Sequence, residues 1–231
     1  MPEKTNEITA IPDLLDMLAE AGQLAGAVVT IDAMGCQVGI AQAIINHGAD
    51  YVLSLKGNQP TLEADVLNYF RTAPADEIVS TTTLEKGHGR IETRKYRASA
   101  KVDWIASDHR YPGELRFPSI KTLVEVQRTT ELAGQIRRET SIYISSLALR
   151  IDRTATAIRG HWGVEAMHWI LDVQFKDDLS RYRQGHGARN MAVIRRFALD
   201  LVRAANIKGS VKKRRFIATL KPQALLQILN L

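Results

Sequence analysis

The first 75 residues alternate between helix-like and strand-like patterns of apolar positions. Two short apolar runs, 26–32 and 51–56, predict strands that are buried on both faces and therefore parallel, and the first run is rich in β-branched residues. Asp32 ends the first run and Lys56-Gly-Asn-Gln59 ends the second, so both are expected at the sheet edge where open α/β sheets bind ligands. Apolar residues spaced three or four apart predict helices at 8–20, 37–47 and 61–70.

Residues 76–150 have a different pattern, and within them 78–100 is rich in Thr and partly alternates between polar and apolar positions. Alternation with a period of two is typical of strands that have one buried face. We therefore expect an antiparallel insertion after the predicted βαβ unit. Its expected strands lie within 78–100, 120–130 and 135–145, with turns at 86–90, 111–113 and 132–134.

The last third of the chain is predicted to be helical, with helices at 155–175, 190–205 and 222–231. In the first of these helices, residues three and four apart share a face, and that face carries His161, Glu165, His168 and Asp172. Apolar residues flank this polar line, among them Trp162. A carboxylate and two imidazoles in such apolar surroundings are costly unless they are paired or bound to a ligand.

Composition sets limits on these expectations. The chain has 231 residues, of which 45% are hydrophobic, enough for a core of one large or two small domains. No apolar run is long enough to span a bilayer and no signal-peptide pattern opens the chain, so no membrane partner is expected. A single cysteine excludes a disulfide framework and suits the cytoplasm. We divide the chain into 1–75, 76–150 and 151–231.

The net charge of +6 is unevenly distributed. Residues 1–150 hold 16 Lys and Arg against 19 Asp and Glu, whereas residues 151–231 hold 15 against 6. These counts give −3 for the first part and +9 for the second. A basic segment joined to a nearly neutral body is typical of a protein with a polyanionic partner such as nucleic acid, although many basic surfaces are only solvated.

The spacing of Asp32 and Glu165 leaves alternatives open. Asp32 is either a ligand at a sheet edge or the N-cap of the following helix. Glu165 is either a metal ligand or a core carboxylate that is hydrogen-bonded to His161 or Arg159. Glu165 and His168 also form the Glu-x-x-His pattern of di-iron helices, but the only other copy of that pattern, at 85–88, lies in a turn.

Two further features have weaker functional interpretations. Cys36 has His residues nearby in the sequence, but nothing there positions a base to activate its thiol. Lys212-Lys-Arg-Arg215 is most often a solvated run, and beside a nuclease-like site it would follow phosphates.

Three segments of the chain form a specific combination of motifs. They are Ile31-Asp-Ala-Met-Gly-Cys-Gln37, Tyr51-Val-Leu-Ser-Leu-Lys-Gly-Asn-Gln59 and His161-Trp-Gly-Val-Glu-Ala-Met-His-Trp-Ile-Leu-Asp-Val173. Together they resemble the insertion-sequence DDE transposases of the H-repeat-associated group. The opening segment 4–12 and the segments 177–183 and 188–190 resemble this family as well, so the resemblance extends over nearly the whole chain.

The resemblance implies an α/β fold of ribonuclease-H type, with the antiparallel insertion before the helix that carries the glutamate. It implies DNA strand cleavage and transfer with two divalent metals, Mg²⁺ or Mn²⁺, held by two aspartates and a glutamate. Asp32 matches the second aspartate and Glu165 matches the glutamate. We expect supporting roles around them for Arg159, His161, His168, Lys56, Asn58 and Gln59. We expect DNA-backbone contacts from Arg181, Arg183, Arg189, Arg195, Lys212, Lys213, Arg214 and Arg215.

The sequence also departs from the family pattern. Ile158, His161 and Asp172 stand where related transposases have Tyr, Arg and Lys, and Ala166 stands where Asn usually follows the glutamate. The first aspartate belongs to strands that come before the segment 4–12 in the family. We therefore expect a core that lacks its first strands, with weak metal binding and little or no activity.

The rival hypothesis is a non-catalytic DNA-binding or regulatory fragment of a transposase, and a third is an unstable product of a decayed gene. The expected partners are transposon-end and target DNA, a second copy of the chain, or an intact transposase. The expected location is the bacterial cytoplasm, in association with the nucleoid.

Overall fold

The computed structural model describes residues 7–87, 89–106 and 117–229. The chain forms two compact units, Met1–His161 and Trp162–Leu231. The turn expected at 111–113 lies outside the described residues. None of the described helices combines the length and the apolar character needed to cross a membrane.

The first unit begins with the predicted βαβ arrangement. β1 and β2 are parallel, with Val28 opposite Asp50, and α2 connects them. The helices that accompany these strands are amphipathic, as their apolar spacing predicts. The bounds of the elements are α1 (Glu7–Glu20), β1 (Val28–Ile31), α2 (Val38–Asn46), β2 (Asp50–Leu55) and α3 (Pro60–Thr72).

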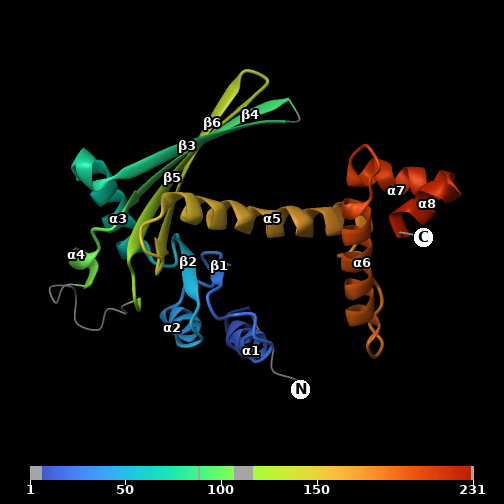
Figure 1. The fold of residues 1–231 in the computed structure, drawn as a ribbon, viewed down its shortest axis with the longest axis horizontal. Coiled ribbons are helices and arrows are strands. Elements are labelled where there is room, and N and C mark those ends of the chain that lie inside the picture. The colour runs from blue at the N-terminus through green and yellow to red at the C-terminus, as the bar shows by residue number, and fades with distance from the viewer. Residues whose placement is uncertain (1–6, 88, 107–116, 230–231) are drawn as a thin grey trace. The chain divides into compact units, whose positions relative to one another are not determined.

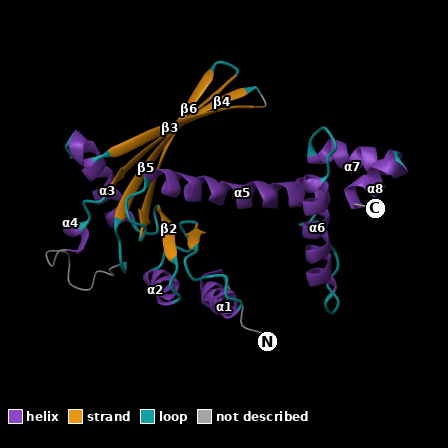
Figure 2. Ribbon diagram, in the orientation of Figure 1, coloured by secondary structure: helices purple, strands orange, loops and turns teal. Residues whose placement is uncertain are grey.

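The antiparallel strands expected after the βαβ unit are confirmed, and they continue the same sheet. The described strands form one six-stranded sheet in the order β1-β2-β6-β5-β4-β3, in which β6 pairs antiparallel with β2 (Figure 2). The division into 1–75, 76–150 and 151–231 stays a prediction. The further elements are η1 (Ala75–Glu77), β3 (Val79–Gly87), β4 (Arg90–Ser99), α4 (Asp103–Ala106), β5 (Thr122–Leu132) and β6 (Gln135–Ser145).

The two faces of the sheet have separate cores, because successive side chains of a strand point to opposite faces. Tyr51 and Leu53 of β2 pack into a cluster with residues of α1, α2 and α3. Val52 packs on the other face, in a cluster that contains Ile158 from α5 (Ile151–Phe175). In Figure 1 the first turns of α5 lie across the sheet on the face opposite α1 and α2.

The second unit contains the rest of α5 and three further helices, with a small core formed by Val202, Ala205 and Ile228. α5 begins four residues earlier than the expected helix at 155–175. The run Lys212 to Arg215, for which we expected no helix, lies in α7, where the Ser210 hydroxyl accepts a hydrogen bond from the backbone N–H of Lys213 at 3.3 Å. The helices are α6 (Gly187–Ala204), α7 (Val211–Leu220) and α8 (Pro222–Leu229).

Candidate functional site

Asp32 follows β1 directly and forms a tight turn with its own backbone. Its Oδ1 accepts hydrogen bonds from the backbone N–H groups of Met34 at 3.1 Å and Gly35 at 3.2 Å. The N-cap of α2 is Gln37, not Asp32, so the N-cap interpretation of Asp32 is wrong. The Asp32 side chain is exposed at the end of the strand, where it is available to a ligand.

The loop after Asp32 is held in place by residues that follow β2. The Asn58 side-chain amide donates to the carbonyl oxygens of Ala33 and Cys36, and the Gln59 amide donates to the Cys36 carbonyl at 3.3 Å. Asn58 Oδ1 in turn accepts from the backbone N–H of Lys56 at 3.2 Å. Both amides therefore act on the loop backbone, and the Lys56 side chain is exposed beside them.

Gly35 is required where the same loop passes β1. A Cβ atom at this position would collide with the side chain of Ile31, which is held in the strand. The loop therefore follows β1 so closely that only a glycine fits there.

His161 connects α5 with β1. Its Nδ1 lies 3.3 Å from Oγ1 of Thr30, and the donor in this contact depends on the tautomer of the imidazole. Thr30 lies in β1, two residues before Asp32. The contact joins residues 131 positions apart in the sequence and fixes the first turns of α5 against β1, the strand that Asp32 follows.

Arg159 has a partner that the sequence did not indicate. Its Nε and Nη2 donate to Oε1 and Oε2 of Glu85 on β3, both at 2.9 Å. These hydrogen bonds hold the pKa of Glu85 below its usual value, and the same pairing raises the pKa of Arg159. Arg94 Nη1 lies 3.2 Å from Glu85 Oε1, and the buried Arg94 also pairs with the buried Glu92. Arg159 therefore joins α5 to the β3–β4 hairpin.

Glu165 and His168 lie farther along α5 and belong to the second unit. Glu165 is four residues after His161, which is about 6 Å along a helix axis. Its side chain is exposed, which does not agree with the alternative of a core carboxylate. Among the residues that the structure describes, no group of three or more His, Cys, Asp or Glu side chains forms a metal cage.

Three of the eight residues that we expect to contact DNA have partners within the chain. Arg195 Nη1 donates to Oδ1 of Asp177 at 2.6 Å. Arg214 donates to three carbonyl oxygens at the end of α6, those of Val202, Arg203 and Ala205, at 3.0–3.1 Å. Arg215 stacks on Phe175, 4.0 Å from the ring centroid, and also donates to the carbonyl of Gln174.

The other five expected DNA contacts have exposed side chains, and these form no hydrogen bond or ion pair with the part of the chain that the structure describes. Such cations remain available to a polyanion. They are Arg181, Arg183, Arg189, Lys212 and Lys213.

The sequence analysis missed the buried charges of β4. Glu92 and Arg94 are two residues apart, on the face of β4 that also carries the buried Tyr96. The sequence contained a signal for this pair, because Glu92 and Arg94 carry opposite charges and residues i and i+2 of a strand share a face.

The sequence matches the transposase DDE domain family over residues 1–201. A protein of Escherichia coli O157:H7 named "Putative transposase YncI" is 37% identical over 220 residues, which are 92% of this chain and 54% of that protein. The "H repeat-associated putative transposase YhhI" of Escherichia coli strain K12 is 34% identical over 207 residues, 87% of this chain and 52% of that protein. The "Uncharacterized protein in dhlA 3′region" of Xanthobacter autotrophicus is 42% identical over 144 residues, 62% of this chain and 45% of that protein.

The chain spans about half the length of the curated relatives it matches. Among solved structures, a sugar N-methyltransferase from Streptoalloteichus matches 52% of this chain and 42% of its own, with 13% identity and a TM-score of 0.21, which is too distant for an argument about fold. The mixed α/β unit with its six-stranded sheet is consistent with a DDE transposase domain. The family match over residues 1–201 confirms the resemblance that the sequence motifs predicted, and the chain belongs to the transposase DDE domain family.

Proposed function

We propose that this chain forms part of the catalytic core of a DDE transposase, of ribonuclease-H type, which cleaves and transfers DNA strands. Asp32 and Glu165 are assigned to one metal site. The observation that carries this proposal is the family match over residues 1–201, a range that contains both Asp32 and Glu165.

Asp32 and Glu165 offer the kind of ligand atoms that Mg²⁺ and Mn²⁺ prefer, but they are two carboxylates where the triad has three. The proposed ligands are two exposed carboxylates, and carboxylate oxygens are the hard ligands that these ions prefer. The first aspartate of the triad has no counterpart among these residues. Asp16, which lies on α1, pairs with His47 at 2.8 Å. Two carboxylates without a third bind a metal ion weakly, so we propose that Asp32 and Glu165 by themselves hold it weakly.

The side chains of this chain have separate tasks in the proposed reaction. Asn58 and Gln59 fix the Asp32 loop through its carbonyl groups, so the carboxylate is positioned before a ligand arrives. His161 fixes the nearby turn of α5 against Thr30. When bound, divalent metal would stabilise the charge that develops at the phosphodiester being cleaved.

Metal-dependent nicking of supercoiled plasmid tests this proposal. We expect slow nicking that requires Mg²⁺ or Mn²⁺ and falls roughly a hundredfold or more in Glu165→Gln and in Asp32→Asn, because each substitution removes a charged ligand. Glu131→Gln is the matched control, because Glu131 is an exposed carboxylate on β5. Nicking that is equal in all four proteins would show that another group performs the cleavage.

A second candidate function is non-catalytic DNA binding by a transposase fragment. The five exposed cations of the second unit favour it, because they are available to phosphates whether or not metal is bound. Salt-sensitive DNA binding without metal-dependent cleavage would support this candidate over the enzyme. In both cases the expected partner is DNA, and an intact transposase or a second copy of the chain is a possible protein partner.

A further inference from the structure

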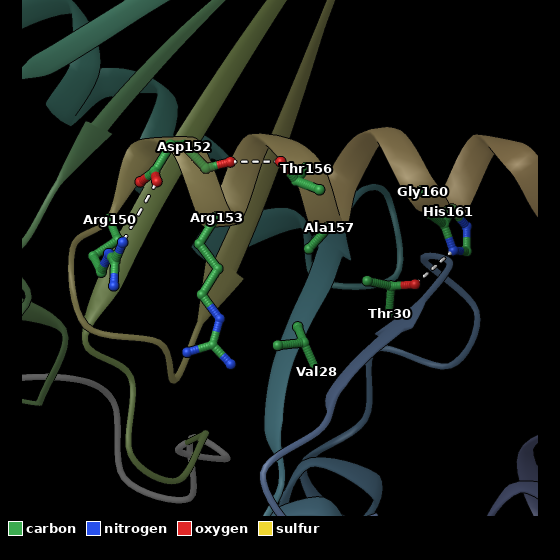
Figure 3. Close-up of a pocket in the computed structure, with 9 residues that line it drawn as sticks. All are labelled: Val28, Thr30, Arg150, Asp152, Arg153, Thr156, Ala157, Gly160 and His161. Carbon is green, nitrogen blue, oxygen red and sulfur yellow. Dashed lines mark hydrogen bonds and ion pairs between the residues drawn. The ribbon is translucent and has the colours of Figure 1, made fainter.

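A pocket of about 560 Å³ lies between β1 and the first turns of α5 (Figure 3). Its volume is within the range of about 300–1,000 Å³ that is typical of ligand pockets. It belongs to the first unit alone. The residues that line it are Val28, Thr30, Arg150, Asp152, Arg153, Thr156, Ala157, Gly160 and His161.

One end of this pocket carries two guanidinium groups. In Figure 3 the side chain of Arg153 extends from α5 into the pocket, toward the side of Val28. Arg153 forms no hydrogen bond or ion pair with any residue that the structure describes. Arg150 lies beside it, and its Nη2 is 3.6 Å from Oδ2 of Asp152. This single exposed carboxylate leaves the pair of arginines with an excess positive charge.

The middle of the pocket is apolar and its far end is polar. Val28 and Ala157 face the space between the arginines and His161, and Gly160 adds no side chain there (Figure 3). At the far end, His161 and Thr30 contact each other. A ligand that fits has negative charge at the arginine end, an apolar body, and a hydrogen-bonding group near Thr30.

We propose that this pocket binds the sugar–phosphate backbone of DNA, with phosphate oxygens on Arg150 and Arg153 and a sugar against Val28 and Ala157. This inference rests on the proposed function and adds a DNA contact in the first unit. Guanidinium groups match phosphate oxygens in a two-pronged geometry, and such contacts set the register of a bound strand. Thr30 is two residues before Asp32, so a backbone held here leads toward the proposed catalytic carboxylate.

The salt dependence of DNA binding tests the assignment. The affinity of the full chain for a fluorescently labelled duplex oligonucleotide is measured over a range of salt concentrations. The slope of log K against log salt is negative, and each lost phosphate contact lowers its magnitude by about 0.9. We therefore expect a decrease of about 1 for Arg153→Ala and about 2 for the double variant Arg150→Ala/Arg153→Ala. Arg138→Ala is the control, because Arg138 is an exposed arginine on β6 outside the pocket.

A second variant tests the pocket without changing its charge. Ala157→Phe places a ring in the apolar middle and should weaken binding with an unchanged slope, and circular dichroism melts confirm that each variant is folded. Equal slopes for the double variant and Arg138→Ala would overturn the assignment, even if the wild type binds DNA and cleaves it. A wild-type chain that binds no DNA would overturn the proposed function as well. If Ala157→Phe changes self-association while the arginine variants bind DNA normally, the pocket holds polypeptide, and the assignment is wrong.

Discussion

At the scale of single residues, the Asp32 loop is the best-defined part of the candidate site. Four residues in or beside it have physical roles that do not depend on a ligand: Asp32 closes its own turn, Gly35 allows the close approach to β1, and Asn58 and Gln59 hold the loop carbonyls. Cys36 lies inside this loop and is fully buried. The loop is therefore a rigid support for one exposed carboxylate.

Cys36 is expected to be chemically inert in the folded protein. Burial raises the pKa of its thiol to about 12, an effect that outweighs the opposing hydrogen bond with Asn58. At about pH 8 only about one molecule in ten thousand would then carry the reactive thiolate. Iodoacetamide should label Cys36 fully in urea and hardly at all in buffer, as measured by mass spectrometry. Rapid labelling in buffer would mean that the loop opens or that the thiolate is stabilised.

At the scale of elements, the most informative contact is between α5 and the β3–β4 hairpin. Glu85 receives two hydrogen bonds from Arg159 and lies within 3.2 Å of the buried Arg94. This pairing joins α5 to the hairpin. The positions of the polar residues along α5 did not predict it. Arg159 is thus a structural residue of the fold before it has any role in the site.

The Glu85 contact predicts a pH-dependent difference in stability. Because the pKa of Glu85 is lowered in the folded state, its stabilisation is complete above the pKa of the unfolded chain and is lost as the pH falls through the folded value. Glu85→Gln should therefore lower the free energy of unfolding by about 1 kcal/mol or less near pH 7, since the pair is partly exposed. The difference should shrink as the pH is lowered from about 7 into the acid range, where Glu85 becomes protonated.

Urea unfolding of Glu85→Gln and of the wild type, at about pH 7 and in acid, measures this difference in the free energy of unfolding. Glu131→Gln on β5 is the control and should change the stability little at either pH, because Glu131 has no ion pair with the described residues. A Glu85→Gln deficit that persists unchanged in acid would exclude the ion pair as its cause.

At the scale of the whole molecule, positive charge is concentrated in the last third of the chain, but that charge has two uses. Arg195, Arg214 and Arg215 are occupied by a carboxylate, by helix-end carbonyls and by an aromatic ring. Five exposed cations have no such partner among the described residues: Arg181, Arg183, Arg189, Lys212 and Lys213. Net charge therefore overstates the number of groups that are available to DNA.

Substitutions of neighbouring residues on α7 distinguish cations that are available to DNA from cations that hold the fold together. Lys212→Ala/Lys213→Ala should lower the magnitude of the slope of log K against log salt by about 2 and leave the melting temperature nearly unchanged. Arg214→Ala should leave the slope nearly unchanged and cost about 1–3 kcal/mol of stability, because three carbonyls at the end of α6 lose their charged donor. Fluorescence anisotropy and thermal melts measure the two effects. A large slope change for Arg214→Ala with normal melting would contradict this division.

The amino-acid sequence by itself determined the parallel β1–β2 pair, the antiparallel strands after them and the family. These follow from periodicity and local motifs, which are properties of neighbouring residues. Only the tertiary structure decided which cations are occupied, since Arg159 meets Glu85 across 74 positions and Arg215 meets Gln174 across 41. A formal charge does not specify whether its partner is water, a carboxylate or a carbonyl, because that choice depends on the packing of segments far apart in the chain.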